Sequence, residues 1–330
     1  MILSPFSDTM TKRPLGNSGL QVAPLALGGN VFGWTIDRNT SFAVLDAFVD
    51  HGFNLVDTAN IYSTWVPRHQ GGESETIIGQ WLASTGKRDK IVLATKVGME
   101  MGDGSKGLTK KNILKSVEDS LARLQTDHID LYQSHKDDEA TPLEETLSAY
   151  DTLLKQGKVR AIGASNYTAT RLRQALDISA AQHLPAYVSL QPEYNLYDRA
   201  GFEAELEPLC LEKSLGVISY FSLASGFLTG KYRSEADLGK SARGSGIGKY
   251  LNDRGFRILA ALDEVSAAHG VPLAAIALAW LIQRPAVTAP IASATSVAQM
   301  ADLAKAAAVV LSVEDVARLD QASASGSPAS

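Results

Sequence analysis

The chain has 330 residues, of which 45% are apolar and 20% charged, as is ordinary for a soluble globular protein. Its net charge of −5 gives no reason to expect nucleic acid or an anionic membrane as a partner, and no apolar run is long enough to span a bilayer. The single cysteine, Cys210, excludes internal disulfides and cysteine-rich zinc sites, and the absence of a signal-peptide pattern predicts a cytoplasmic protein.

Apolar patterns predict strands that alternate with helices along the chain. The turn-rich segment Gly16–Gly19 separates Lys12–Leu15 from Leu20–Val22 and predicts a β-hairpin ahead of them. The expected strands are Val22–Gly28, Asn54–Ala59, Ile91–Val97, Ile129–Ser134, Val159–Ala164, Val188–Pro192, Gly216–Ser222 and Val287–Ala292. The expected helices are Thr40–His51, Glu73–Thr85, Thr109–Leu124, Pro142–Gln156, Thr168–Ala181, Gly201–Ser214, Asp253–His269, Leu273–Arg284, Val297–Ala308 and Val313–Gln321.

Most strand–helix units repeat at roughly thirty-residue spacing, which predicts an α/β fold built as a (β/α)8 TIM barrel. The strands are continuously apolar, as is typical of parallel strands buried on both faces. A doubly wound open sheet is the alternative, but Gly28–Gly33 in the first strand–helix turn lacks the dinucleotide fingerprint. We expect one domain over residues 12–321, with disordered termini at residues 1–11 and 322–330.

Three consecutive strands are expected to end on titratable side chains at one edge of the barrel. Asp57 and Lys96 end two of them, His135 follows the third, and Tyr62 lies in the loop after the aspartate. An ammonium beside a phenol lowers the pKa of the phenol, and a neighbouring aspartate keeps that ammonium charged. A histidine at the same place can donate a hydrogen bond to a carbonyl oxygen during reduction. The four residues predict a proton-donating site, and a structural Asp57–Lys96 ion pair is the plainer alternative.

Other polar and aromatic residues near these strand ends have simpler interpretations. Asp130 lies at the amino end of its strand, where a structural role is expected. The acidic run Asp137–Glu139 has no second histidine at a suitable spacing, so no metal site is expected. Trp34, Trp65 and Phe227 lie in loops and indicate an apolar or stacking wall for the substrate, although loop tryptophans often only pin a loop to its scaffold.

Several runs follow one another in a characteristic order: Gly52–Ala59 with Tyr62, Ala94–Lys96, Leu131–His135, Gly163–Tyr167, Gln191–Asn195 and Leu223–Tyr232. Together they resemble the aldo-keto reductase family over nearly the whole chain. Members of that family are (β/α)8 barrels that bind a nicotinamide cofactor across the carboxyl face. The resemblance implies that Tyr62 is the general acid and that Lys96 tunes it. It also implies that Asp57 pairs with the lysine and that His135 orients the substrate carbonyl.

The resemblance further implies which residues hold the cofactor. They are Ser165, Asn166 and Gln191 at the carboxamide, Tyr220 against the nicotinamide ring, Leu223, Ser225, Gly226 and Lys231 in the pyrophosphate loop, and Ser293, Thr295 and Gln299 at the adenosine. The chain departs from the family pattern in three places. It has Tyr220–Leu223 as Tyr-Phe-Ser-Leu instead of Tyr-Ser-Pro-Leu. It also has Thr295 where many members place an arginine on the 2′-phosphate, and Leu303 where asparagine often meets the adenine. A hydroxyl anchors phosphate less well than a guanidinium, so NADP(H) is expected with a reduced margin over NAD(H).

The resemblance therefore predicts an NADP(H)-dependent oxidoreductase that interconverts aldehydes or ketones and alcohols. The expected partner is a small-molecule carbonyl or alcohol, with no nucleic acid and no membrane. A cofactor-binding regulatory protein resembling potassium-channel β subunits is the alternative. Such proteins usually carry an N-terminal extension, whereas about ten residues precede the hairpin here. A Schiff-base lyase using Lys96 is a third hypothesis, but a lysine paired with an aspartate stays protonated and is a poor nucleophile.

Overall fold

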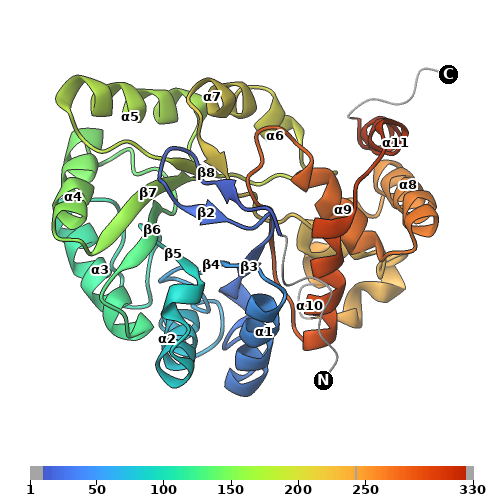
Figure 1. The fold of residues 1–330 in the computed structure, drawn as a ribbon, viewed down its shortest axis with the longest axis horizontal. Helices are drawn as coiled ribbons and strands as arrows, with labels where there is room; N and C mark the ends of the chain where they lie inside the picture. Colours follow the sequence, from blue (N-terminus) through green and yellow to red (C-terminus); the bar gives the residue numbers. More distant parts are fainter. Residues whose placement is uncertain (1–9, 242–243, 325–330) are drawn as a thin grey trace.

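The computed structural model describes residues 10–241 and 244–324, and a curled parallel sheet forms its centre (Figure 1). The strands are β3 (Ala26–Gly28), β4 (Leu55–Asp57), β5 (Val92–Val97), β6 (Ile129–Ser134), β7 (Val159–Ser165), β8 (Ser189–Gln191), β9 (Gly216–Val217) and β10 (Ile291–Ala292). They are hydrogen-bonded in the order β10-β3-β4-β5-β6-β7-β8-β9. The N–H groups of Thr288 and Ile291 donate to Val217 O and Ser219 O at 2.8 Å and join the two edges. The predicted (β/α)8 barrel is confirmed.

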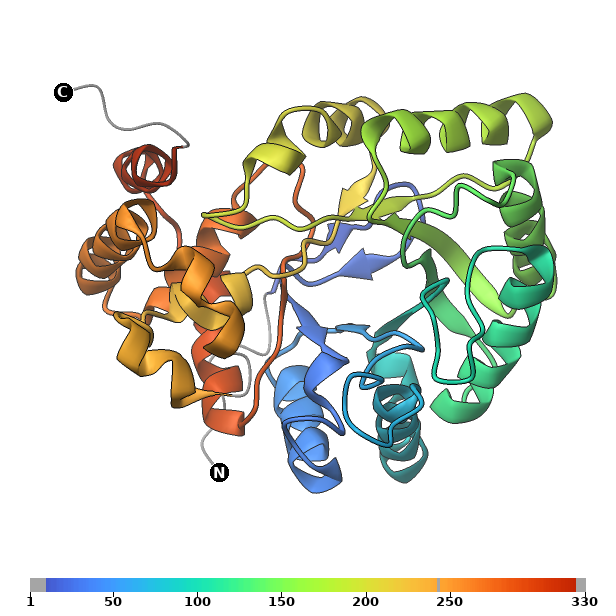
Figure 2. The ribbon, with the colours of Figure 1, turned by 180° about the vertical axis from the view of Figure 1, so that it is seen from behind.

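Helices surround the barrel, and α8, α9 and α11 group together at one side of it (Figures 1 and 2). The helices are α1 (Arg38–Asp50), α2 (Glu73–Thr85), α3 (Lys110–Leu124), α4 (Leu143–Lys155), α5 (Ala169–Gln182), α6 (Ala200–Glu203), α7 (Leu206–Glu212), α8 (Asp253–His269), α9 (Leu273–Ile282), α10 (Val297–Ala304) and α11 (Val313–Ser323). The single helix predicted over residues 201–214 is wrong. It is broken between α6 and α7, because the backbone of Glu205 leaves the helical region at φ −132°.

The helix α9 is apolar on all sides because nearly all of it is buried. No single helix in the described part of the chain is long and apolar enough to cross a membrane. Helices α8 and α9 together reach the length and composition of a span, but they are bent by 94° where they meet.

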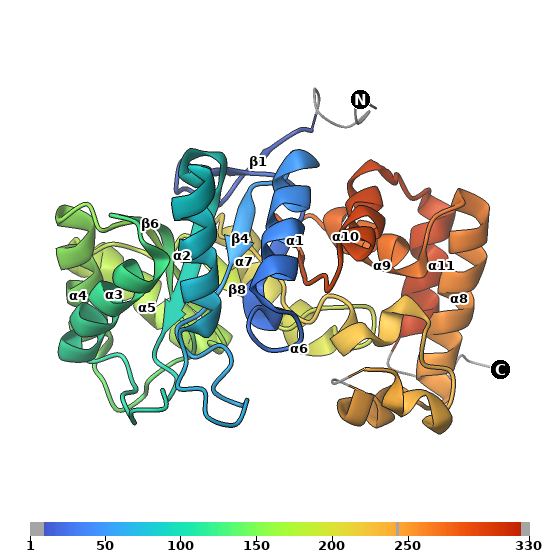
Figure 3. The same cartoon turned by 90° about the horizontal axis from the view of Figure 1, so that it is seen from below.

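The predicted N-terminal hairpin lies at one end of the barrel, and the long loops after β4 and β9 lie at the other (Figure 3). Its strands are β1 (Arg13–Pro14) and β2 (Gln21–Val22), paired antiparallel. Leu15, Leu20 and Val22 pack against the apolar side chains inside the barrel. The hairpin therefore covers the amino end of the barrel, and in a barrel of this kind the carboxyl end is where a site is expected.

The strands place a polar layer above the apolar interior. Inward side chains on a strand are two residues apart. On β4, β5 and β6 an apolar inward residue is followed two positions later by a polar one: Leu55 by Asp57, Ala94 by Lys96, and Leu131 by Gln133. The three polar side chains are fully or almost fully buried. This layer is the floor of the candidate site.

The expected disorder of residues 322–330 is wrong for the first of these residues. The last helix, α11, extends to Ser323, which is buried. Arg254 Nη2 donates to Ser323 O at 2.6 Å, and Arg199 Nη1 donates to Ser323 Oγ at 2.5 Å. Arg254 thus satisfies a carbonyl at the end of the helix, and Arg199 fixes the side chain of Ser323. Met10 packs partly buried against the core, and the remaining expected disorder, at residues 1–9 and 325–330, lies outside the described residues.

Candidate active site

Lys96 lies at the centre of the carboxyl end and joins two of the predicted catalytic residues. Its Nζ donates to Asp57 Oδ2 at 2.6 Å, to Thr58 O at 2.8 Å and to Tyr62 Oη at 2.9 Å. Lys96 and Asp57 are buried, whereas Tyr62 is partly exposed. A lysine ammonium cannot accept a hydrogen bond, so the phenol oxygen must be the acceptor. The hydroxyl proton of Tyr62 is therefore free to be donated elsewhere.

The charges of these three residues are coupled. Burial by itself lowers the pKa of Lys96, but Asp57 and Tyr62 raise it by more than burial lowers it. The pKa of Lys96 therefore lies above its ordinary value, and the ammonium stays protonated. Burial raises the pKa of Tyr62, Lys96 lowers it and Asp57 raises it again, and the result lies above the ordinary value. Lys96 thus has the expected lowering effect on the pKa of Tyr62, but burial outweighs it, and Tyr62 keeps its proton at neutral pH.

His135 directly follows β6, and its ring packs edge-on to Tyr62 with centroids 6.0 Å apart. Its main-chain N–H donates to Val97 O at 2.8 Å, which places it beside the end of β5. Burial and the nearby charge of Lys96 hold the pKa of His135 well below its usual value, so the imidazole is neutral. Its Nδ1 is buried without a hydrogen-bond partner. The site thus has a neutral imidazole beside a protonated phenol.

Gln133, which was not among the predicted site residues, contacts the same aspartate. Its Nε2 donates to Asp57 Oδ1 at 3.1 Å, and Gln191 Nε2 donates to the same oxygen at 3.0 Å. Gln191 Nε2 also lies 3.2 Å from Gln133 Oε1. The signal that could have found Gln133 is the alternation along β6, because it lies midway between inward-facing Leu131 and His135.

The residues predicted for the carboxamide and the nicotinamide ring come together at the ends of β7, β8 and β9. Ser165 Oγ donates to Gln191 O at 2.8 Å, and Asn166 Nδ2 lies 3.1 Å from Ser165 Oγ. The same amide nitrogen donates to His135 O at 2.9 Å. Tyr220 Oη donates to Asn166 Oδ1 at 2.8 Å, and burial raises the pKa of Tyr220 to about 12. This cluster is hydrogen-bonded directly to the segment that carries the histidine.

The predicted pyrophosphate loop has an unusual backbone. Positive φ values occur at Phe221 (50°), Ala224 (47°), Ser225 (56°) and Gly226 (100°), around the 3-10 helix η3 (Ala224–Thr229). The N–H groups of Ala224 and Gly226 donate within the loop, to Phe221 O at 2.7 Å and to Leu223 O at 2.9 Å, and so hold these tight turns together. A Cβ at Gly226 would lie 3.6 Å from Lys231 Nζ, so the ammonium lies beside this loop.

Two other residues of this loop point into the fold. Leu223 is partly buried against the core. Phe227 is fully buried and stacks on Tyr250, with ring centroids 5.2 Å apart and planes 17° apart. The prediction that Phe227 forms part of a substrate wall is therefore wrong, because its ring fixes the loop to the scaffold.

The predicted adenosine residues gather where β10 leads into α10. Ser293 Oγ donates to Asn30 Oδ1 at 2.6 Å. The N and Oγ1 of Thr295 both lie 2.9 Å from Gln299 Oε1. The structure brings the three residues together, but their side chains already have protein partners. The same is true of the residues predicted for the nicotinamide end, so a bound cofactor would have to replace some of these hydrogen bonds.

The two predicted substrate tryptophans belong to an aromatic series that starts at Tyr62. Trp65 packs edge-on to Tyr62 with centroids 6.1 Å apart, and Trp34 packs edge-on to Trp65 at 5.4 Å. Trp65 is 47% exposed, so the series runs from the buried site to the surface. An apolar wall beside the phenol is consistent with the predicted location of a substrate.

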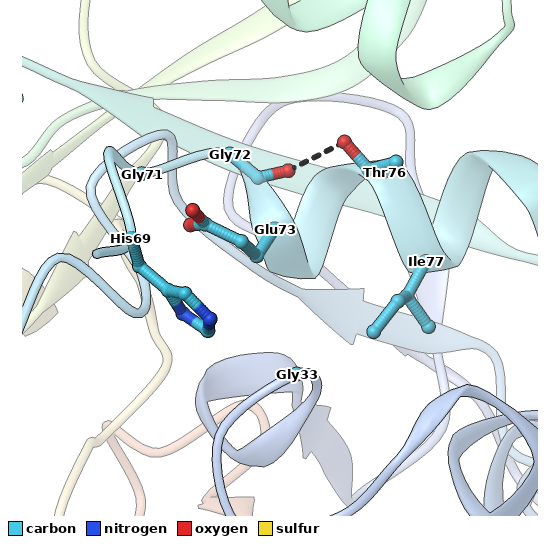
Figure 4. A pocket seen from close by; sticks show the side chains of 7 residues that line it. All are labelled: Gly33, His69, Gly71, Gly72, Glu73, Thr76 and Ile77. Atoms are coloured by element: carbon cyan, nitrogen blue, oxygen red, sulfur yellow. Dashed lines mark hydrogen bonds between the residues drawn. The ribbon is translucent and has the colours of Figure 1, made fainter. Parts of the chain in front are cut away.

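A separate hollow lies at the start of α2 (Figure 4). It is lined by Gly33, His69, Gly71, Gly72, Glu73, Thr76 and Ile77. Thr76 Oγ1 donates to Gly72 O at 2.8 Å, and Glu73 Oε1 accepts from Gln70 N at 2.9 Å. None of the predicted site residues lines this hollow.

The acidic run after His135 is used for structure. Arg171 Nε donates to Asp137 Oδ2 at 2.8 Å, and the Leu108 N–H donates to Asp138 Oδ2 at 2.7 Å. Within residues 10–241 and 244–324, no three histidine, cysteine, aspartate or glutamate side chains are close enough to hold a metal ion together.

Fold and site define a class of protein: a (β/α)8 barrel with a buried lysine, bonded to an aspartate and a tyrosine, at the carboxyl ends of its strands. The sequence model of the Aldo/keto reductase family matches residues 24–324, and the chain belongs to this family. Its relatives include an oxidoreductase named YrpG from Bacillus subtilis (strain 168), which is 37% identical over 91% of this chain and 92% of its own. A probable voltage-gated potassium channel subunit beta from Arabidopsis thaliana is 33% identical, over 91% and 92%. Aldo-keto reductase AMT2 from Alternaria alternata is 32% identical, over 97% and 93%.

Proposed function

We propose that this protein is an NADP(H)-dependent oxidoreductase that interconverts aldehydes or ketones and alcohols. The observation that carries the proposal is the position of Lys96, which is hydrogen-bonded to Asp57 on one side and to Tyr62 on the other. The lysine directs the proton of the phenol away from itself. A buried, charged ammonium at 2.9 Å would also stabilise the phenolate that remains after proton transfer.

The residues around Tyr62 have complementary tasks in this reaction. NADP(H), when bound, supplies or accepts the hydride. Tyr62 donates its proton to the carbonyl oxygen as the alcohol forms, and it accepts the proton back in the reverse direction. His135 holds the same oxygen through a ring N–H, which strengthens as negative charge develops there. Asp57 keeps the ammonium of Lys96 charged throughout.

The chain has a set of groups that fits a nicotinamide dinucleotide. Ser165, Asn166 and Gln191 would hold the carboxamide, and Tyr220 would stack on the ring. The loop after β9, with the ammonium of Lys231 beside it, would hold the pyrophosphate. Ser293, Thr295 and Gln299 would lie nearest the adenosine. Because Thr295 replaces an arginine, we expect NADPH to bind more tightly than NADH by a modest margin.

The direct test is the oxidation of NADPH by the purified protein with a panel of aromatic and aliphatic aldehydes and ketones. Turnover with any member of the panel supports the proposal. Titration of NADPH and NADH by tryptophan fluorescence quenching tests the cofactor separately. Clearly tighter binding of NADH would overturn the NADP(H) assignment and leave the roles of Tyr62 and Lys96 intact.

The second candidate is a cofactor-binding regulatory subunit. It is favoured by one observation, the similarity to proteins named as potassium channel β subunits. The same titration and turnover assays separate the two functions. A protein that binds NADPH tightly but turns over no carbonyl in the panel would support the regulatory function.

A further inference from the structure

We infer that Gln133 is a positioning residue that locks the side-chain amide of Gln191, so that the oxygen Oε1 of Gln191 is the atom left free for the cofactor. The inference rests on the proposed function, because it assigns a nicotinamide carboxamide to this position. It goes beyond that function by naming a residue that would not contact the cofactor at all.

The orientations of both amides follow from the carboxylate between them. Asp57 Oδ1 can only accept hydrogen bonds when the carboxylate is ionised, and Lys96 bonded to Oδ2 favours that state. Gln133 and Gln191 approach Oδ1 at 3.1 and 3.0 Å, so each must present its nitrogen to it. The oxygen of Gln133 is then left to accept the second N–H of Gln191, at 3.2 Å.

The side chain of Gln191 can therefore act toward a ligand only as a hydrogen-bond acceptor. An amide nitrogen has two N–H donors, and Asp57 and Gln133 use both of them. The carbonyl oxygen alone is available to a ligand, and it needs a donor. A carboxamide N–H group supplies that donor, whereas an acetyl group of similar size does not.

The barrel holds Gln133 in a space shaped for it. Gln133 is fully buried, and it pairs across the sheet with Lys96 on one side and Gly163 on the other. A Cβ at Gly163 would lie 3.1 Å from Gln133 Cγ and 2.5 Å from Ser189 Oγ. The missing side chain on β7 therefore leaves room for the glutamine, and β5 aligns it with the lysine.

The test compares two cofactors that differ only at this group: NADPH, and its analogue in which acetyl replaces the carboxamide. We expect the wild-type protein to bind NADPH about tenfold more tightly, since the analogue leaves a buried acceptor unpaired. In Gln133→Leu, Asp57 still holds one N–H of Gln191, but the other N–H loses its acceptor and can donate to the acetyl oxygen of the analogue. We therefore expect this ratio to fall below about threefold. Tryptophan fluorescence quenching measures both dissociation constants.

Two further variants separate positioning from general packing. Gln133→Glu keeps an oxygen for Gln191 and, when protonated beside Asp57, a donor for the carboxylate, so we expect the tenfold ratio to be retained. Ser134→Ala removes hydrogen bonds to Tyr150 and Tyr187 from the same strand on its opposite face, and we expect the wild-type ratio there as well. Gln133→Met replaces the leucine variant if that protein does not fold.

Three results would overturn the inference while leaving the proposed function standing. They are a wild-type ratio near one, a tenfold ratio that survives in Gln133→Leu or Gln133→Met, and an equal loss of the ratio in Ser134→Ala. A wild-type protein that binds neither cofactor would overturn the proposed function, and this inference with it.

Discussion

Two buried aspartates lie at opposite ends of the barrel, and their surroundings differ in kind. At the amino end, Asp130 accepts hydrogen bonds of 2.8 Å from Arg88 Nη2, Arg160 Nη1 and the N–H of Leu93. At the carboxyl end, Asp57 accepts from Lys96 at 2.6 Å and from two glutamine amides. Both carboxylates are saturated with donors, as buried charges must be.

The two networks differ in the other hydrogen bonds that their cations make. The guanidinium groups around Asp130 stay charged, and they clamp β5, β6 and β7 to one another. The ammonium of Lys96 instead donates a further hydrogen bond to the hydroxyl of Tyr62, a residue that is partly exposed. Beside that hydroxyl, His135 Nδ1 is buried without a partner. The amino-end network is closed on itself, and the carboxyl-end network is open toward a ligand, which is a mark of function rather than stability.

The largest expected effect comes from breaking the open network at its last residue. Tyr62→Phe removes the proton donor and almost nothing else, so we expect the rate of carbonyl reduction to fall by about 10²–10⁴-fold with cofactor affinity largely kept. Steady-state kinetics and cofactor titration measure the two quantities. Near-normal turnover would contradict the assignment of Tyr62 as the acid.

The next effect comes from removing the central cation. Lys96→Met leaves Asp57 buried without its counter-charge, so we expect the free energy of unfolding to fall by about 3–5 kcal/mol, together with a loss of turnover. Urea denaturation measures the first and kinetics the second. In the double variant Asp57→Asn, Lys96→Met we expect stability to recover in part and activity to stay low. Full activity in Lys96→Met with an unchanged pH profile would show that the lysine does not tune Tyr62.

The matched experiment at the closed network is Asp130→Asn. It keeps the shape of the side chain and removes the charge that holds Arg88 and Arg160. We expect a loss of about 1–3 kcal/mol in the free energy of unfolding and no change in turnover per folded molecule. A loss of kcat at unchanged folded fraction would show that the two ends of the barrel are coupled.

The smallest effect concerns His135 and pH. Its pKa in the folded protein lies well below the ordinary value, so the unfolded chain binds more protons than the folded chain below about pH 6.5. The contribution of His135 to stability is thus fully present above that pH and falls as the pH decreases. Between pH 6 and pH 5 we expect the wild-type protein to lose about 1 kcal/mol more than His135→Gln. Parallel denaturant titrations of the two proteins give this difference. Identical pH dependences would show that the pKa of His135 in the folded protein is not lowered.

The barrel and the four catalytic candidates could be predicted because they rest on local patterns. Each strand is a short apolar run, and its carboxyl end is marked by the residue that follows that run, as with Asp57, Lys96 and His135. In a parallel barrel all of these ends meet on one face. The strand order and the meeting of Tyr62 with Lys96 follow from that rule, which needs no knowledge of side-chain packing.

The partners of each polar atom could not be obtained in this way, because they depend on contacts between residues far apart in the chain. Gln133 and Gln191 meet on Asp57 from 76 and 134 residues away, and only the alignment of neighbouring strands brings them there. The burial of Phe227 against Tyr250 and the net rise in the pKa of Tyr62 also depend on burial in the folded protein. Short-range sequence patterns predict which residues form this site. Packing and desolvation in the closed barrel determine the hydrogen bonds and the protonation of those residues.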